Sequence, residues 1–503
     1  MIYWLQQSLL LVFALWSIGN SISYGQERNI RPFIRADANV DGKIDISDSI
    51  SIISYLINSN NVKCEKAMDV NDSAIIDISD AIFLINYLFL GGIQPAEPFP
   101  MMGVDVSLDE LSCEKYFLRN QEWENIRLTF VTDTPPPQTE TTNISVKDLG
   151  IASSENGYAV VWIDPREGSG NLYLVIVDGD GQKLSNEIKI TDYPAGTKYT
   201  EVMRPKIVGD DGGYAIFWRG NPLIATPTNN DHIFFARFDL AGKRLTENIS
   251  ITPEGLAIRD YVDSVWDGDA YGVVWAQRGN ENSLDIYFAR VDNNGNKLTK
   301  EVIVFTLNDF AQPKIIWTGS EYGIAWWGNM ERGGERKAYF ARMDLEGNLK
   351  EDVFQLQACN DISMSAIVWD SDSYNIFWVS PASKNFFRTK IVVQDNCSIE
   401  AQKCSLIGVS EYLADDFILD LDIFWSGYEY AIVYSGRFNA KVLRLDIDGN
   451  LIDISNISDL HSIEPHGPKI VMSKTKYGIC WIDRRDEHKF SQQPGEVYFA
   501  TGY

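Results

Sequence analysis

The sequence predicts a mostly β fold, in which a seven-bladed β-propeller follows a small N-terminal α-helical module. The main observation is a repeat: a Tyr is followed at the fourth position by Trp or Tyr, with apolar residues between them. Its copies begin 47 to 57 residues apart, and strand-rich repeats of roughly 40–50 residues are typical of propellers and related arrays. A second observation, an oxygen-rich loop with calcium-ligand spacing, predicts the helical module. The seven copies of the Tyr repeat are Tyr158–Trp162, Tyr214–Trp218, Tyr271–Trp275, Tyr322–Trp326, Tyr374–Trp378, Tyr430–Tyr434 and Tyr477–Trp481.

Each repeat contains signals for four strands. In one copy, apolar runs at Pro313–Trp317, Tyr322–Trp327, Ala338–Asp344 and Asp352–Leu356 are separated by turns or charged loops. Such runs are typical of strand–turn–strand units, and four strands make one propeller blade. Four blades also carry a Trp five residues before the repeat Tyr. We interpret it as a packing layer rather than an aromatic sugar-binding ring, because aromatic side chains bury large areas. These are Trp266, Trp317, Trp369 and Trp425.

The two ends of the repeat region predict how the ring closes. The last copy stops after Val497–Tyr503, its third strand, so its fourth strand is missing. Asn125–Asp133 resembles the fourth strands of other copies, such as Glu187–Asp192. We therefore expect residues 125–133 to complete the seventh blade, because such closure removes an exposed sheet edge.

Residues 37–48 have the spacing of an EF-hand calcium loop. Oxygen-bearing side chains occupy loop positions 1, 3, 5, 9 and 12. Gly42 stands at position 6, where the loop turns sharply, and Lys43 at position 7 offers its backbone carbonyl. Ca²⁺ requires such a shell of hard oxygen ligands. The predicted side-chain ligands are Asp37, Asn39, Asp41, Asp45 and Asp48.

A second copy of the loop begins 32 residues later and has weaker ligands. Ala74 replaces the Gly of position 6, and Ser73 replaces the third acidic group. Lower ligand charge predicts weaker binding of Ca²⁺ at this second site. The other interpretation is a degenerate loop that folds without metal. The predicted ligands are Asp69, Asn71, Ser73, the backbone carbonyl of Ile75, Asp77 and Asp80.

With these paired loops, residues 30–100 resemble the type I dockerin family. The resemblance is carried by Asp at position 12 of each loop and by the helix that follows, which begins Ile-Ser-Asp-x-Ile and continues to Tyr-Leu. It implies a module that folds on calcium and binds the cohesin domains of a scaffold protein through exposed helix residues after the loops. Ser47 and Ser79 occupy that neighbourhood. Docking on another part of the same chain, or a spacer role, is the alternative.

The sequence divides into four parts. Residues 1–25 have the pattern of a secretory signal peptide, with a retained N-terminal anchor as the alternative. Residues 30–100 form the dockerin-like module, 101–122 a linker and 123–503 the propeller. An exported chain can oxidise its six Cys residues, and Cys64 and Cys113 could tie the module to its linker. These features predict a secreted or cell-surface protein.

Charge and motifs limit the functions. A net charge of −26 repels nucleic acid and anionic membranes, and no segment of the mature chain is apolar for long enough to span a bilayer. We expect a calcium-binding assembly or recognition protein whose propeller binds a protein or a glycan. The alternative is a polysaccharide-degrading glycoside hydrolase that uses paired carboxylates on the charged loops. Trp-Ile-Asp-x-Arg occurs at Trp162–Arg166 and again at Trp481–Arg485, which favours a structural Asp–Arg bridge, so no catalytic residue is assigned.

Overall fold

The chain forms two compact units, Met1–Asn120 and Gln121–Tyr503, in a computed structural model. The predicted signal peptide, residues 1–25, lies outside the described residues, as does most of the predicted linker. The structure describes residues 33–40, 43–58, 64–99, 105, 109, 111–113, 123, 125–129, 146–155, 157–167, 170–194, 202–220, 231–252, 258–279, 283–308, 311–329, 336–356, 364–380, 385–394, 399–401, 405–407, 421–436, 439–458, 462–463, 465–474, 476–485 and 495–502.

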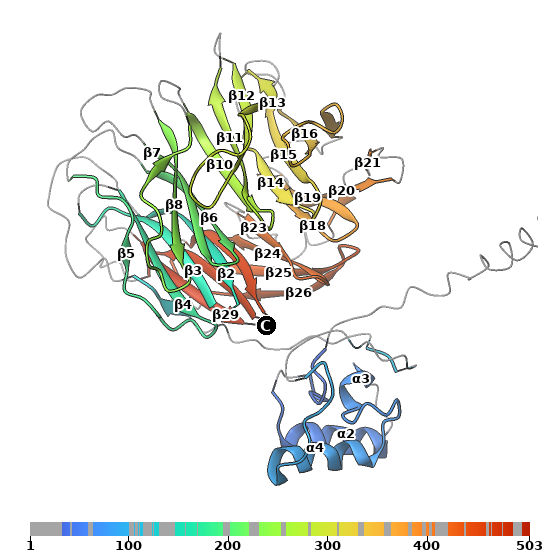
Figure 1. Ribbon diagram of the computed structural model, residues 1–503. Helices are drawn as coiled ribbons and strands as arrows, with labels where there is room; N and C mark the ends of the chain where they lie inside the picture. The colour runs from blue at the N-terminus through green and yellow to red at the C-terminus, as the bar shows by residue number, and fades with distance from the viewer. Residues whose placement is uncertain are drawn as a thin grey trace, which may run out of the picture. The chain divides into compact units, whose positions relative to one another are not determined.

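The first unit is a small helical module. Its helices are α2 (Ile46–Asn58), α3 (Glu65–Met68) and α4 (Ile78–Leu90), and α2 packs against α4 (Figure 1). Asp77 and Asp80 cap the start of α4 reciprocally, and Gly91 ends it in the left-handed conformation. None of the helices in the described part of the chain is long and apolar enough to cross a membrane. The module core consists of Ala36, Ala38, Ile52, Met68, Val70, Ala81, Leu84 and Phe99.

The described residues of the segment predicted as a linker are bonded to this module. Cys64 and Cys113 form a disulfide, as the sequence suggested they could. Ser112 donates to the carboxylate of Glu65, and Lys66 forms ion pairs with Asp105 and Asp109. This part of the segment is therefore ordered as an extension of the module.

The second unit is a propeller of antiparallel sheets arranged around a centre (Figure 1). Each blade is a sheet of four strands that follow one another in sequence, except that the fifth blade has an additional strand and the seventh borrows one. The predicted seven-bladed propeller is confirmed. Blades one to three contain β2 (Lys147–Ser154), β3 (Gly157–Asp164), β4 (Asn171–Asp178), β5 (Ile188–Lys189); β6 (Met203–Asp210), β7 (Gly213–Gly220), β8 (His232–Asp239), β9 (Ile249–Ser250); and β10 (Ile258–Trp266), β11 (Tyr271–Arg278), β12 (Leu284–Val291), β13 (Val302–Leu307).

Blades four to seven continue the same pattern. They contain β14 (Lys314–Trp317), β15 (Tyr322–Asn329), β16 (Arg336–Met343), β17 (Phe354–Leu356); β18 (Met364–Trp369), β19 (Ser373–Ser380), β20 (Asn385–Val393), β21 (Ile399–Ala401), β22 (Ser405–Leu406); β23 (Leu421–Trp425), β24 (Glu429–Ser435), β25 (Ala440–Asp446), β26 (Leu451–Asn456); and β27 (His466–Ser473), β28 (Lys476–Asp483), β29 (Glu496–Gly502), with β1 (Ile126–Arg127) as the borrowed strand.

The borrowed strand closes the ring as the sequence predicted. Ile126 and Arg127 pair with Phe499 and Tyr498 of β29, and the backbone N–H of Leu128 donates to the carbonyl of Val497. Residues 130–133 of the predicted strand lie outside the described residues. Pairing the two ends of the repeat region in one sheet leaves β29 without a free edge.

The hydrophobic cores lie between neighbouring blades. One cluster, for example, combines residues of blades one and two, including Leu174 and Trp218. The repeat Tyr and Trp side chains are almost fully buried. Each of the four additional Trp residues packs against the repeat Tyr of its own blade, with ring centroids 4.5 to 4.8 Å apart, which supports the packing interpretation.

The repeat Tyr also bonds to the preceding blade. In five cases its hydroxyl donates to a carboxylate at or just after the end of the first strand of that blade, and an Arg of the same blade pairs with most of these carboxylates; Tyr158 donates instead to the backbone carbonyl of Lys476. Glu429, for example, accepts from Tyr477 Oη and from Arg444 Nε, both at 2.8 Å. We call these groups Tyr–acid clamps. They are Asp210 with Tyr271, Asp267 with Tyr322, Glu321 with Tyr374, Asp370 with Tyr430, and Glu429 with Tyr477.

Candidate metal centre

The first predicted calcium loop leads into α2, and the acidic residues at its first and last positions are turned toward the interior of the module. Asp37 and Asp48 are completely buried. The two carboxylate oxygens of Asp48 accept from the backbone N–H groups of Asn39, at 3.2 Å, and Asp45, at 2.9 Å. The amide of Asn39 donates to Ser47 Oγ at 2.8 Å. Predicted ligand Asp41 and the turn residue Gly42 lie outside the described residues.

The second loop repeats this arrangement 32 residues later. Asp80 accepts from the backbone N–H groups of Asn71, at 3.2 Å, and Asp77, at 2.9 Å. The amide of Asn71 donates to Ser79 Oγ at 2.9 Å, and Ser73 Oγ donates to the carbonyl of Ile75 at 3.1 Å. The two loops therefore share the bonds made by the Asp at position 12 and the Asn at position 3, although their sequences differ at three of the predicted ligand or turn positions.

Several predicted ligands lie at the exposed rim. Asp45 and Asp77 each accept from the backbone N–H of the Ser two residues later, at 2.8 and 2.6 Å. Hydrogen bonds from the Ser47 and Ser79 side chains lower the pKa of these two carboxyl groups. Lys43 is exposed. The rim groups are therefore ionised at neutral pH.

The second loop contains two buried carboxylates that form no salt bridge in the part of the chain that the structure describes, although the charge of Arg35 acts on Asp69. Asp69 and Asp80 are 1% and 0% exposed, and neither forms a salt bridge with any residue in the described ranges. Burial raises the pKa of both carboxyl groups, although backbone N–H groups oppose the shift. Burying an unpaired carboxylate costs several kcal/mol, so this site favours a bound cation.

An unpartnered oxygen supports the same conclusion. Asn71 Oδ1 is buried and accepts no hydrogen bond from the described part of the chain, because the amide nitrogen of this residue is turned toward Ser79. A buried polar atom without a partner is rare in folded proteins. Carboxylate, amide and hydroxyl oxygens are the donors that Ca²⁺ prefers. The residues present therefore fit calcium, and Asp69, Asn71, Ser73, Asp80 and the carbonyl of Ile75 would hold it in the second loop.

The replacement at position 6 has a visible consequence. Ala74 adopts φ of +63°, a left-handed conformation that the usual Gly adopts without penalty. Its backbone N–H donates to Asp69 Oδ2 at 2.8 Å. The second loop thus keeps the sharp turn of a calcium loop in spite of the Ala side chain.

A second group of carboxylates near the loops is already neutralised. Asp72, Asp105 and Asp109 lie close enough together to share a cation. Arg35 pairs with Asp72 at 3.0 Å and with Asp105 at 3.2 Å, and Lys66 pairs with Asp105 and Asp109. Sequence reasoning did not identify this network, because Arg35 and Asp105 carry no periodic or spacing signal. It is a structural support for the module.

The propeller loops bear the carboxylates considered for catalysis. Asp164 pairs with Arg166, and Asp483 pairs with Arg485 at 2.6 Å. The repeated Asp–Arg bridge is therefore present in blades one and seven. Each acid also accepts from the indole N–H of the Trp two residues earlier. Of the other charged loop residues, Glu331, Arg332, Glu335 and Asp486 lie outside the described residues.

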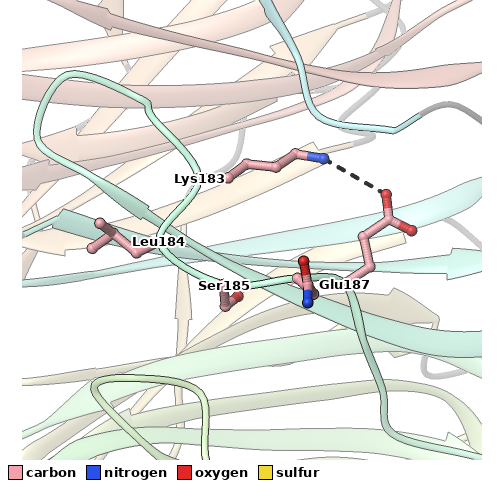
Figure 2. Close-up of a pocket in the computed structure, with 5 residues that line it drawn as sticks. Lys183, Leu184, Ser185 and Glu187 are labelled. Atoms are coloured by element: carbon pink, nitrogen blue, oxygen red, sulfur yellow. Dashed lines mark ion pairs between the residues drawn. The ribbon is translucent and has the colours of Figure 1, made fainter.

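Figure 2 shows a hollow in the turn between β4 and β5, lined by residues 183–187. The ammonium of Lys183 points to the carboxylate of Glu187 across 3.7 Å. Glu187 also pairs with Arg166 at 2.6 Å. Its lining contains one carboxylate, and glycoside hydrolysis uses two, so this hollow lacks the groups for that chemistry.

Comparison with solved structures finds distant likenesses. A prolyl endopeptidase is 13% identical, with coverage of 70% of this chain and 47% of that chain and a TM-score of 0.43. This chain therefore spans about half the length of that protein. An oligogalacturonate lyase from Vibrio parahaemolyticus is 11% identical, with coverage of 76% and 94% and a TM-score of 0.44. A GH43 endo-arabinanase from Bacillus licheniformis is 13% identical, with coverage of 51% and 97% and a TM-score of 0.30. Likenesses at this level carry no information about activity.

Comparison with family models gives a specific result for the first unit. No curated protein matches the chain. The model described as "Dockerin type I domain" matches residues 35–89, the range that contains both loops, α2, α3 and all of α4 except its last residue. Type I dockerin domains bind calcium, and dockerin domains bind cohesins. Residues 35–89 are therefore a type I dockerin domain, which this chain carries ahead of a seven-bladed β-propeller.

Proposed function

We propose that this protein is a secreted assembly or recognition protein. Its dockerin domain folds on two Ca²⁺ ions, the second bound more weakly, and attaches the chain to a cohesin-like protein. The propeller then presents its loops to a protein or a glycan. The observation that carries the calcium part is the pair of buried carboxylates, Asp69 and Asp80, which form no salt bridge with any described residue.

A repeated apolar surface supports the docking part. Ile50 of α2 and Ile82 of α4, which lie 32 residues apart, are 60% and 51% exposed. Ile57 and Phe89, at the next equivalent pair of positions, are 74% and 63% exposed. Large apolar side chains exposed at repeated positions mark an interaction surface. Because each helix carries such a set, either helix could present it to a partner.

Binding to a panel of recombinant type I cohesin domains tests this proposal. The full chain should bind at least one member in calcium, and the signal in biolayer interferometry should disappear with chelator. Ile50→Asp combined with Ile82→Asp should weaken binding by about 100-fold or more, because charges would replace buried apolar contacts. Leu240→Asp, at an exposed turn of the propeller, is the matched control and should bind normally.

The outcomes separate the alternatives. If every cohesin fails while the isolated propeller added in trans binds the dockerin domain, the docking is within the chain. The proposal also predicts no release of reducing sugar from a panel of polysaccharides. Robust turnover that is lost on mutation of one acidic loop residue would instead establish the glycoside hydrolase alternative.

A further inference from the structure

The first strands of the blades form the inner circle of the propeller. Each of these strands contacts the first strand of the next blade, from β2 through β6, β10, β14, β18 and β23 to β27, and β27 contacts β2 (Figure 1). At one register, each strand places a residue opposite the third residue after the repeat Tyr. We call this set the axial ring. Its members are Gly150, Lys206, Asp263, Lys314, Ala366, Asp422 and Lys469.

The two acids of the axial ring are held by their neighbours. Asp263 Oδ1 lies 2.9 Å from Lys206 Nζ, and its Oδ2 accepts from the backbone N–H of Ile315 in the next blade at 3.1 Å. Asp422 Oδ2 accepts in the same way from the backbone N–H of Ile470 at 3.1 Å. Both carboxylates are thus engaged between blades.

Two of the three lysines in the axial ring are not held by an ion pair with any described residue. Within the described part of the chain, Lys314 and Lys469 form no salt bridge. The charge on Lys314 interacts with Asp263, Lys206, Lys469 and Asp422, which belong to four different blades. The charges of the ring therefore converge around the axis. Burial lowers the pKa of Lys314, which agrees with an ammonium that lacks a close anionic partner.

The charge of the ring does not balance. Three lysines face two aspartates, an excess of one positive charge in a chain whose net charge is −26. Uncompensated charge enclosed by protein is costly. Water still reaches the ring, because the side chain of Lys206 is 40% exposed although neighbouring strands surround it. Lys314 and Lys469 are also partly exposed, so none of the three lysines is sealed from solvent.

We propose that the axial ring binds an oxyanion, held by the ammonium groups of Lys314 and Lys469, with Lys206 nearby. The ligand is either a free inorganic anion or the carboxylate of an acidic sugar. This site needs only the propeller and is independent of the proposed role of the dockerin domain. The alternative is that the ring is only an electrostatic lock between blades, in which case these lysines affect stability but bind nothing.

Titration of the calcium-loaded full chain tests the proposal. Sodium sulfate and sodium galacturonate are added at constant ionic strength, set with sodium chloride, and binding is followed by calorimetry and by the unfolding temperature of the propeller. At least one of the two ligands should bind saturably, and which one binds identifies the source of the oxyanion. Lys314→Met combined with Lys469→Met should weaken this binding by about tenfold or more, since one charge-assisted hydrogen bond corresponds to roughly 10- to 100-fold. Lys243→Met combined with Lys300→Met removes the same two charges from exposed positions and should leave binding unchanged.

Two results would overturn the site. One is the absence of saturable binding by either ligand, and the other is undiminished binding in the double variant. Because the double variant could unfold, a second measurement uses the wild-type chain. Crystals soaked in selenate, an anomalous scatterer with the shape of sulfate, should give a peak between Lys314 and Lys469. Peaks found only elsewhere on the molecule would show that the axial ring does not bind the anion.

Discussion

The dockerin domain and the propeller both bury carboxylates, but they neutralise them differently. In the propeller, Glu429 is 1% exposed and is bound by Arg444 and by Tyr477, all from the chain itself. In the dockerin domain, Asp69 and Asp80 are buried as deeply and accept hydrogen bonds mainly from backbone N–H groups. A buried acid that has its own cation is part of the architecture, whereas one that lacks a cation indicates a ligand that is still to bind.

This difference predicts which part of the molecule depends on calcium. Chelation should unfold the dockerin domain and leave the propeller folded, because Arg side chains of the chain itself pair with the clamp acids. At a Ca²⁺ concentration about 1,000 times the dissociation constant, the ion contributes roughly 4 kcal/mol to stability. Limited proteolysis with mass spectrometry should show new cleavage within residues 35–89 in chelator and none in the blades.

Substitution of the predicted calcium ligands checks that bound Ca²⁺ itself stabilises the dockerin domain. Asp37→Ala combined with Asp41→Ala should abolish high-affinity binding in a calorimetric titration and expose the same residues to protease. Asp192→Ala changes an acid whose side chain is 88% exposed in the propeller and is the control. An unchanged titration in the double variant would refute the assignment of the first loop.

Replacement of the acid in a Tyr–acid clamp should also destabilise the propeller strongly. Calcium should not change this loss of stability. Glu429→Ala leaves the buried guanidinium of Arg444 without its partner and should destabilise the propeller by about 3–5 kcal/mol, the usual effect of breaking a buried ion pair. Glu429→Ala combined with Arg444→Met should recover part of the loss, because no unpaired charge remains. Chemical denaturation measures both, with the exposed Glu346→Ala as control. A loss below about 1 kcal/mol would mean that water neutralises Arg444.

The clamps also show what sequence reasoning could and could not reach. The spacing of the repeat Tyr and Trp predicted the blades, because the same core position recurs in each one. The partner of each Tyr hydroxyl was not predictable, since it lies about one repeat earlier and is sometimes an Asp at the start of a turn and sometimes a Glu at its end, as Asp370 and Glu321 show.

The calcium loops were predictable for a different reason. A loop of twelve residues brings its own ligands together, so spacing alone identifies them. The ion pairs of Arg35 and the convergence of Lys206, Lys314 and Lys469 depend on residues far apart in sequence. Their positions become visible only when the module and the ring have folded.

Two tyrosines allow the hydrogen bond of a clamp to be measured. Tyr374 Oη donates to Glu321 at 2.7 Å. The buried hydroxyl of Tyr214 lies near the Ser154 side chain, not near a carboxylate, and has no hydrogen-bond partner of normal geometry in the described part of the chain. Tyr374→Phe should destabilise the propeller by about 1 kcal/mol or more, because a buried acceptor loses its donor. Tyr214→Phe should change stability by only a few tenths of that amount. Equal effects in thermal unfolding would show that ring packing, rather than the hydroxyl, gives the repeat Tyr its role.

The smallest expected effect returns to the calcium loops, where the two copies differ at position 6. Ala74 holds a left-handed backbone conformation, with φ of +63°, which costs an L-residue other than Gly roughly 1 kcal/mol. Ala74→Gly should therefore stabilise the calcium-loaded dockerin domain by about 0.5–1 kcal/mol, even though Gly also increases the entropy of the unfolded chain. Ala96 is exposed and has no positive φ, so Ala96→Gly relieves no strain and only increases the entropy of the unfolded chain. It should therefore destabilise the domain slightly. Unfolding of the domain at fixed free calcium measures both. If Ala74→Gly destabilises as much as Ala96→Gly, the second loop does not hold the sharp turn that its hydrogen bonds to Asp69 indicate.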